Sequence, residues 1–182
     1  LWNAYVPMHL LPRLHGYELM MAPYAIAHMK IGLKLFETGY KFKSNERARI
    51  YLTNALMPAQ ESFGMFAFAM PALSKEAHEV NLIKRKQIFT VVIGNPPYLG
   101  ESGPSDRWIG DLLSDYKKEP GGRSKLLERN SKWLNDLYVK FIRLSSHLIE
   151  QSGLGVLGFI TNHSYLDNPT FRGMRWHLLD TF

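Results

Sequence analysis

The sequence predicts an α/β domain with a mostly parallel, doubly wound sheet, because short β-prone runs alternate with helix-forming segments. Three observations support this prediction: the apolar run 88–94, which stops at two prolines, the long amphipathic segment 131–151, and the strand-like run 156–161 that follows it. We interpret residues 1–182 as a single domain, since a chain of this length can bury one sizeable core.

The first elements are a short strand and a helix. Residues 14–20 are predicted to form the strand, and Pro23 suits the first turn of the helix. Gly39 is a typical helix stop. Apolar residues recur between these two positions at helical spacing, at Ile26, Met29, Leu33 and Phe36.

The next elements lead to the proline-terminated strand. Residues 49–53 have a β-prone centre and form the second predicted strand. Residues 63–70 are apolar and fit either a helix or a strand, and Pro71 opens a predicted helix that runs through the basic residues 84–86. The run 88–94 is largely apolar and rich in β-branched residues, which is typical of a central strand buried on both faces.

The second half begins with a polar stretch. Residues 101–132 are rich in Gly, Pro, Ser and charge, so we expect a long loop. The helix over 131–151 should follow, then a turn at 153–155 and a strand at 156–161, and Asn168 before a proline should cap the last helix. The predicted apolar face of the long helix comprises Trp133, Leu137, Phe141, Leu144 and Leu148.

Composition narrows the class of protein. Hydrophobic residues make up 46% and charged residues 21%, as in folded globular proteins. Cysteine is absent, which excludes disulfides and thiolate metal sites, and the seven histidines lack metal-like spacing. No apolar segment reaches membrane-spanning length and no secretory signal is visible, so we expect a cytoplasmic protein. The net charge of +6 favours a polyanionic partner.

The segment Asn95-Pro96-Pro97-Tyr98 carries the most specific chemistry. Two prolines have no backbone N–H to donate to a neighbouring strand, so the strand ends there in a stiff loop. Open α/β sheets bind their ligands at this carboxyl end of their strands. The Asn95 side-chain oxygen and the Pro96 carbonyl, which we expect to be exposed, can accept both hydrogens of an exocyclic amine. These bonds strengthen as the nitrogen gains positive charge, and the Tyr98 ring can stack on the base.

This segment resembles the catalytic motif of amino-methyltransferases that use S-adenosyl-L-methionine, above all the adenine-N6 DNA methyltransferases. The wider match, from Gly16 to Leu179, is similar to the methyltransferase region of bacterial single-chain restriction–modification enzymes. The resemblance implies a Rossmann-like fold and methyl transfer to a flipped adenine in duplex DNA. At those four residues, methyltransferases acting on protein glutamine or on RNA guanine-N2 match equally well.

The resemblance also implies roles for four further residues. Glu18 would bind the ribose hydroxyls of the cofactor, and Asn54, where the family often has Asp, would bind its adenine. Phe171, or less well Tyr165, would stack on the flipped base. Each has a simpler alternative: a solvated acid for Glu18, a turn-forming residue for Asn54, and a core aromatic for Phe171.

A basic stretch could contact a DNA backbone or could be a solvated linker. Trp133 and Tyr116 would be available for stacking beside it. Its basic residues are Lys117, Lys118, Arg123, Lys125, Arg129 and Lys132.

One family feature is missing from the sequence. The glycine-rich cofactor loop of these enzymes lies upstream of the segment around Glu18, and no such loop is present here. We therefore expect a methyltransferase domain truncated at its N-terminal strand, cut from a longer chain that carries other domains, such as a nuclease, a translocase or a target-recognition domain. The alternative is a non-catalytic DNA-binding remnant.

Overall fold

The structure is a computed structural model that describes residues 1–43, 46–59, 71–98, 107–128 and 130–182. These residues form two compact units, 1–87 and 88–182, each of which is described by itself. No helix in the described ranges is long and apolar enough to cross a membrane. The single domain over residues 1–182 stays a prediction.

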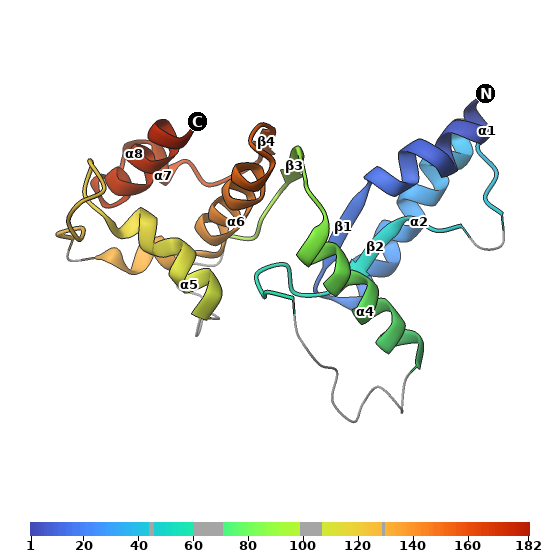
Figure 1. Cartoon of the computed structure of the whole chain (residues 1–182), viewed down its shortest axis with the longest axis horizontal. Coiled ribbons are helices and arrows are strands. Elements are labelled where there is room, and N and C mark those ends of the chain that lie inside the picture. The colour runs from blue at the N-terminus through green and yellow to red at the C-terminus, as the bar shows by residue number, and fades with distance from the viewer. Residues whose placement is uncertain (44–45, 60–70, 99–106, 129) are drawn as a thin grey trace. The chain divides into compact units, whose positions relative to one another are not determined.

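The first unit is built around a parallel pair of strands, β1 and β2 (Figure 1). In this pair Glu18 lies opposite Leu52. Four buried residues, Val6, Leu11, Leu35 and Tyr40, form its main apolar cluster. Its elements are α1 (Trp2–Tyr5), a π-helical turn (Val6–Leu10), a 3-10 turn (Leu11–Arg13), β1 (His15–Glu18), α2 (Met21–Glu37), β2 (Arg49–Leu52) and α4 (Pro71–Lys86).

The predicted strands and helices of this unit are confirmed, with shifts at their ends. Gly39 stops α2 as expected, because its φ of +83° is readily adopted only by glycine. The apolar stripe of α2 is exposed instead of packed, and Phe36 at its end is 67% exposed. The ambiguous segment 63–70 lies outside the described residues.

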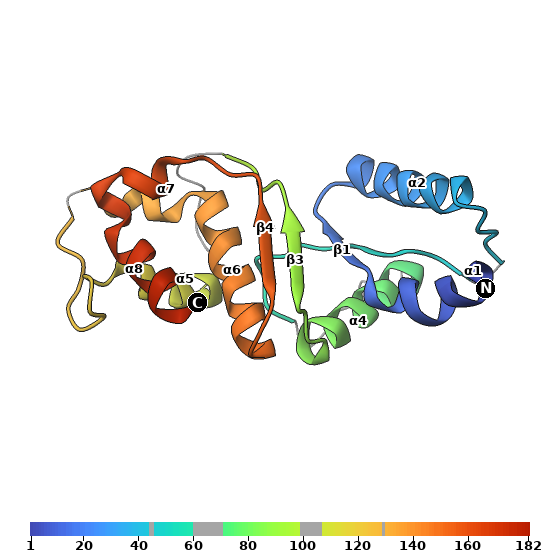
Figure 2. The ribbon, with the colours of Figure 1, turned by 90° about the horizontal axis from the view of Figure 1, so that it is seen from above.

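The second unit contains the other parallel pair, β3 and β4, with Gly94 opposite Phe159. Figure 2 shows the two strands side by side and α6 lying along β4. The elements are β3 (Val91–Gly94), α5 (Arg107–Leu113), 3-10 turns (Ser114–Lys117, Ser131–Asn135), α6 (Leu137–Ser152), β4 (Val156–Phe159), α7 (Ser164–Asp167), a 3-10 turn (Pro169–Phe171) and α8 (Arg172–Thr181).

The turn predicted after α6 is present, because Gly153 ends α6 with a φ of +77°. Asn168 accepts a hydrogen bond from the Thr170 N–H at 2.9 Å, but it caps the 3-10 turn Pro169–Phe171 that leads into α8, and α8 itself begins without a side-chain cap. Asp136 caps the start of α6. The core of the unit comprises nine buried residues: Leu113, Tyr116, Leu126, Leu134, Tyr138, Val139, Ile142, Phe171 and Met174.

Three predictions about this unit are wrong in part. The strand at 91–94 is not buried on both faces: Ile93 is 79% exposed, because β4 is its only partner strand among the described residues. The loop over 101–132 contains α5, whose Ile109 and Leu113 are fully buried. Of the apolar face expected on the long helix only Leu144 is buried; Leu137, Phe141 and Leu148 are half-buried and Trp133 is exposed. The buried face is rotated to include Tyr138, Val139 and Ile142.

The α/β class and the parallel pairing are confirmed. The described strands pair two by two, β1 with β2 and β3 with β4. The continuous doubly wound sheet stays a prediction.

Candidate functional site

The Asn-Pro-Pro-Tyr segment leaves the carboxyl end of β3, as predicted. Asn95, Pro97 and Tyr98 are exposed. Pro96 is a buried residue, so the exposed Pro96 position that we expected is not found. Just before the segment, a Cβ at Gly94 would lie 3.1 Å from the ring of Phe159, so a larger residue there would require that ring to shift.

The Tyr98 hydroxyl connects this segment to the chain beyond β4. Its oxygen lies 2.9 Å from the Asn95 side-chain oxygen and 2.8 Å from the backbone oxygen of Ile160. Two acceptors share one hydroxyl proton, so donation to Ile160 leaves the Asn95 oxygen available to another donor. The backbone repeats this link, because the Ile160 N–H donates to the Gly94 oxygen at 3.1 Å.

An aromatic group supports the Tyr98 ring. Its central member is Tyr138 of α6, which is 2% exposed and whose ring centroid lies 6.4 Å from those of Tyr98, Tyr165 and Phe171. Burial raises the pKa of Tyr138, and its hydroxyl has no hydrogen-bond partner within the part of the chain that the structure describes. Sequence reasoning missed Tyr138 because it assigned the apolar face of this helix to neighbouring positions.

The two stacking candidates differ in burial. Phe171 is 3% exposed and packs in the core, which is the alternative that the sequence left open for it. Tyr165 is half-buried, and its backbone oxygen accepts from the Arg175 guanidinium at 2.8 Å. A stacking role on a substrate stays a prediction for both residues, and Tyr165 is the more accessible.

The candidate cofactor residues lie in the first unit, at the carboxyl ends of a parallel pair. Glu18 ends β1, and one of its carboxylate oxygens accepts the Leu19 N–H at 3.0 Å. Asn54 follows β2, and its side-chain oxygen accepts the Leu56 N–H at 3.0 Å. Asn54 therefore forms the turn that the sequence offered as the alternative, and both cofactor roles stay predictions. The Glu18 carbonyl accepts the Thr53 N–H at 2.7 Å, which joins the two strand ends.

The basic stretch is partly committed to internal contacts. Lys117 donates to the Asn135 side chain at 2.9 Å, and Lys118 pairs with Asp115 at 2.8 Å. Trp133 is 44% exposed beneath the Lys132 ammonium and remains available for stacking. The stacking role expected for Tyr116 is wrong, because that residue is fully buried.

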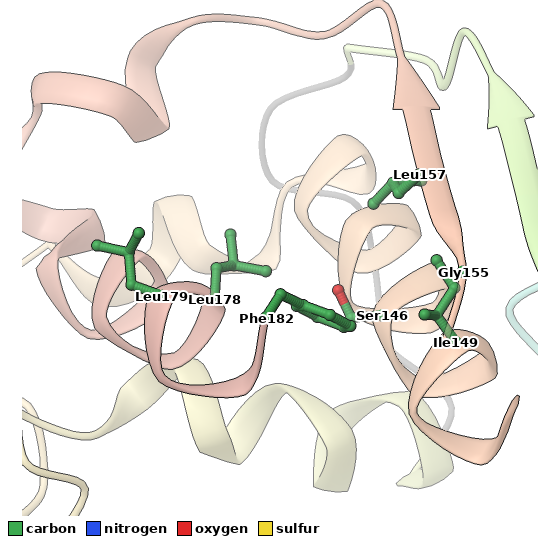
Figure 3. Close-up of a pocket in the computed structure, with 7 residues that line it drawn as sticks. All are labelled: Ser146, Ile149, Gly155, Leu157, Leu178, Leu179 and Phe182. Atoms are coloured by element: carbon green, nitrogen blue, oxygen red, sulfur yellow. The ribbon is translucent and has the colours of Figure 1, made fainter. Parts of the chain in front are cut away.

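A separate cavity of about 350 Å³ lies between α6, β4 and α8 (Figure 3). Gly155 and Leu157 place it at the start of β4, whereas the Asn95 segment follows the end of β3, so the cavity belongs to the opposite end of the strand pair. Ser146 is the only polar residue in a lining completed by Ile149, Gly155, Leu157, Leu178, Leu179 and Phe182.

No three His, Asp or Glu side chains approach one another closely enough to hold a metal ion within the described ranges.

Solved structures resemble this chain, among them the following three. The ATP-dependent Type ISP restriction-modification enzyme LlaBIII bound to DNA is 24% identical, with a TM-score of 0.75 over 97% of this chain and 12% of that one. A nuclease-deletion mutant of the Type ISP restriction-modification enzyme LlaGI, in complex with a DNA substrate mimic, is 21% identical, with a TM-score of 0.77. The match covers 99% of this chain and 14% of that one. The DrdV–DNA complex is 23% identical, with a TM-score of 0.73, and the match covers 99% of this chain and 17% of that one.

These likenesses show the fold, and the chain spans less than a fifth of the length of each of these proteins. No curated protein sequence matches the chain. The family model described as Eco57I restriction-modification methylase matches residues 15–182, which is nearly the whole chain. The chain therefore belongs to the Eco57I restriction-modification methylase family.

Proposed function

We propose that this chain is part of a DNA adenine-N6 methyltransferase that uses S-adenosyl-L-methionine and belongs to a restriction–modification enzyme. The observation that carries the proposal is the exposed Asn95 amide at the end of β3, hydrogen-bonded to the Tyr98 hydroxyl. Membership of a methylase family supports it. A Rossmann-like, doubly wound fold is part of the same proposal.

Asn95 binds the reacting amine in this mechanism. When the Tyr98 hydroxyl donates to the Ile160 oxygen, the Asn95 side-chain oxygen is free to accept a hydrogen of the adenine N6 amine. This bond strengthens as the nitrogen becomes positively charged, so it stabilises the transition state more than the ground state. Pro96 is a buried residue, so the second hydrogen of the amine is not assigned to its carbonyl.

Aromatic rings hold the base. Tyr98 is exposed and rests on the buried Tyr138 ring, so its position is fixed before a substrate arrives. Tyr98 and Tyr165 offer the accessible ring surface for an adenine extruded from the duplex. Extrusion is needed because the amine is inaccessible while the base is stacked and paired.

The cofactor, when bound, supplies an electrophilic methyl group on a sulfonium. The chemistry of the first unit suits the rest of that molecule, because the Glu18 carboxylate can accept ribose hydroxyls and the turn at Asn54 offers amide and carbonyl groups to an adenine. In the reaction a bond forms between N6 and the methyl carbon, the carbon–sulfur bond breaks, and one N6 proton leaves to solvent.

The partners follow from the same proposal. Duplex DNA is the substrate, and the rest of a longer chain provides target recognition, with a nuclease or a translocase among its further domains. The three similar proteins are restriction–modification enzymes or DNA complexes of which this chain spans 12–17%, which supports this proposal.

The test is methyl transfer by the full-length protein from labelled S-adenosylmethionine to duplex DNA, with digestion to nucleosides. We expect label in N6-methyladenine and a loss of about a hundredfold or more in Asn95→Ala. Asn130→Ala is the matched control, an exposed asparagine of the same unit outside the Asn-Pro-Pro-Tyr segment. Label in RNA or protein instead of DNA would refute the substrate, and full activity of Asn95→Ala would refute the mechanism.

A further inference from the structure

Lys84 of α4 makes contacts that neither the family nor the proposed chemistry explains. Its ammonium donates to the backbone oxygen of Asn54 at 2.7 Å and to that of Met57 at 3.0 Å. The same ammonium lies 5.8 Å from the centre of the Tyr17 ring, on the neighbouring strand β1. Burial lowers the pKa of Lys84 to about 8, and no salt bridge to a carboxylate is found for it in the described part of the chain.

These contacts close a small turn at both ends. The Met57 N–H donates to the Asn54 oxygen at 3.3 Å, and the Leu56 N–H donates to the Asn54 side chain at 3.0 Å. Lys84 binds the first and the last carbonyl of this turn at once. Backbone carbonyls that are not solvated need such partners, and a charged donor makes stronger bonds than a neutral one.

The turn is joined directly to the end of β1. The Thr53 N–H, one residue before the turn, donates to the Glu18 oxygen at 2.7 Å. A shift of residues 54–57 would therefore move the carboxyl ends of both strands of the pair. Lys84 reaches this edge from a helix, which is a more rigid support than a loop.

We propose that Lys84 is a positioning residue of the cofactor site, which sets cofactor affinity by holding the turn 54–57 at the end of β2. This inference rests on the cofactor role proposed above for Glu18 and Asn54. Lys84 itself does not touch the reacting atoms. It should therefore affect cofactor binding far more than the methyl-transfer step.

The experiment measures S-adenosylmethionine binding and methyl-transfer kinetics for the full-length protein. Lys84→Met should raise the Kd and the KM for the cofactor by about tenfold and change kcat at saturating cofactor by less than about threefold. Lys84→Arg, which keeps two or more donors, should restore most of the affinity. Lys86→Met is the matched control, an exposed lysine in the last turn of the same helix, and should change neither value.

A double-mutant cycle tests whether Lys84 acts through the turn. In an Asn54→Ala background, Lys84→Met should have a clearly smaller effect on the Kd, because the turn is already disturbed. Additive effects, or a loss confined to kcat, would overturn the inference. If Lys84→Met proves too unstable to measure, Lys84→Gln gives the same comparison, with an amide that reaches only one carbonyl.

Glu18→Ala separates this inference from the proposal on which it rests. If Glu18→Ala and Asn54→Ala weaken cofactor binding but Lys84→Met does not, Lys84 has no positioning role and the cofactor site stands. If the protein binds the cofactor and neither Glu18→Ala nor Asn54→Ala changes the Kd, this edge is not the cofactor site and both statements are wrong.

Discussion

The two units of the chain are stabilised in different ways. In the second unit, nine buried residues pack together beneath the Asn-Pro-Pro-Tyr segment, and Tyr138 connects that core to the exposed Tyr98 ring. In the first unit the main apolar cluster has four residues, and individual charged side chains of α4 bind the ends of the strands. Glu76 accepts the Leu52 N–H at 2.9 Å, and Lys84 binds the turn that follows.

This difference suits the two tasks proposed for the units. Hydrogen-bond acceptors that stabilise a transition state must already be in place, and a close-packed core provides that rigidity. A turn held by single polar contacts depends instead on each of those contacts. Loss of one polar contact should therefore matter most at the strand ends of the first unit, although the second unit also contains ion pairs of the buried Arg143, with Asp115 and Glu150 at 3.0 Å.

The largest effect should come from Gly173→Ala in α8. A Cβ at this position would collide with the backbone oxygen of Lys118 and lie 2.7 Å from that of Tyr116, and backbone atoms cannot move aside as a side chain can. We expect a loss of about 3 kcal/mol or more in the free energy of unfolding of the second unit, measured by hydrogen exchange resolved along the sequence.

Gly110→Ala in α5 is the control for this change. Nothing lies within 4 Å of a Cβ at Gly110, and its φ is not positive. Alanine favours a helix over glycine by up to about 1 kcal/mol, so this variant should be as stable as the natural protein or more stable. Equal losses for the two variants would mean that α8 does not approach the 116–118 carbonyls this closely.

A smaller effect is expected from Glu76→Gln in the first unit. Glu76 accepts hydrogen bonds from Leu52 N–H, Arg47 and Tyr24, and its side chain is only 13% exposed. Losing the charge should cost about 2 kcal/mol, measured by exchange of amides in β1 and β2. Glu37→Gln, in an exposed pair with Lys34, should cost less than about 0.5 kcal/mol.

The Glu76 contribution should depend on pH in a defined direction. Burial opposes ionisation of Glu76, but the Leu52 N–H, Arg47 and Tyr24 hydrogen bonds prevail and lower its pKa below the ordinary value of 4.5. Stabilisation by the carboxylate is therefore complete above that value and is lost as the pH falls through the lowered pKa. The difference between the natural protein and Glu76→Gln should shrink on acidification, and a constant difference would contradict this account.

Tyr98→Phe should have a moderate effect on catalysis and little on stability. The ring and its contact with Tyr138 remain, while the hydroxyl that ties the Asn-Pro-Pro-Tyr segment to the Ile160 oxygen is lost. We expect kcat to fall about tenfold, equivalent to about 1.4 kcal/mol, with an unchanged KM for the cofactor. Tyr98→Ala, which also removes the stacking surface, should lose clearly more activity. Equal losses would mean that the ring itself contributes nothing.

The sequence predicted the order of elements well, because strand and helix signals are local. The proline pair after Gly94, the glycine at 39 and the Asn168 cap each determine the backbone through a few neighbouring atoms. The helix α5 was missed although Ile109, Leu113 and Tyr116 have helical spacing, because glycine and charge dominate the surrounding composition. Contacts such as Lys84 with Asn54, thirty residues apart, have no local signal at all.

Burial was predicted less well than secondary structure, and α2 allows this to be tested. Its apolar periodicity gave the correct helix, yet Phe36 is 67% exposed, since Leu35 is the residue that packs in the cluster with Tyr40. Phe36→Ser should therefore change the free energy of unfolding of the first unit by less than about 0.5 kcal/mol, whereas Leu35→Ala should cost about 3 kcal/mol. Exchange of the β1 and β2 amides measures both variants. A loss above about 1.5 kcal/mol for Phe36→Ser would show that the periodicity correctly indicated a buried face and that this face of α2 is covered in solution.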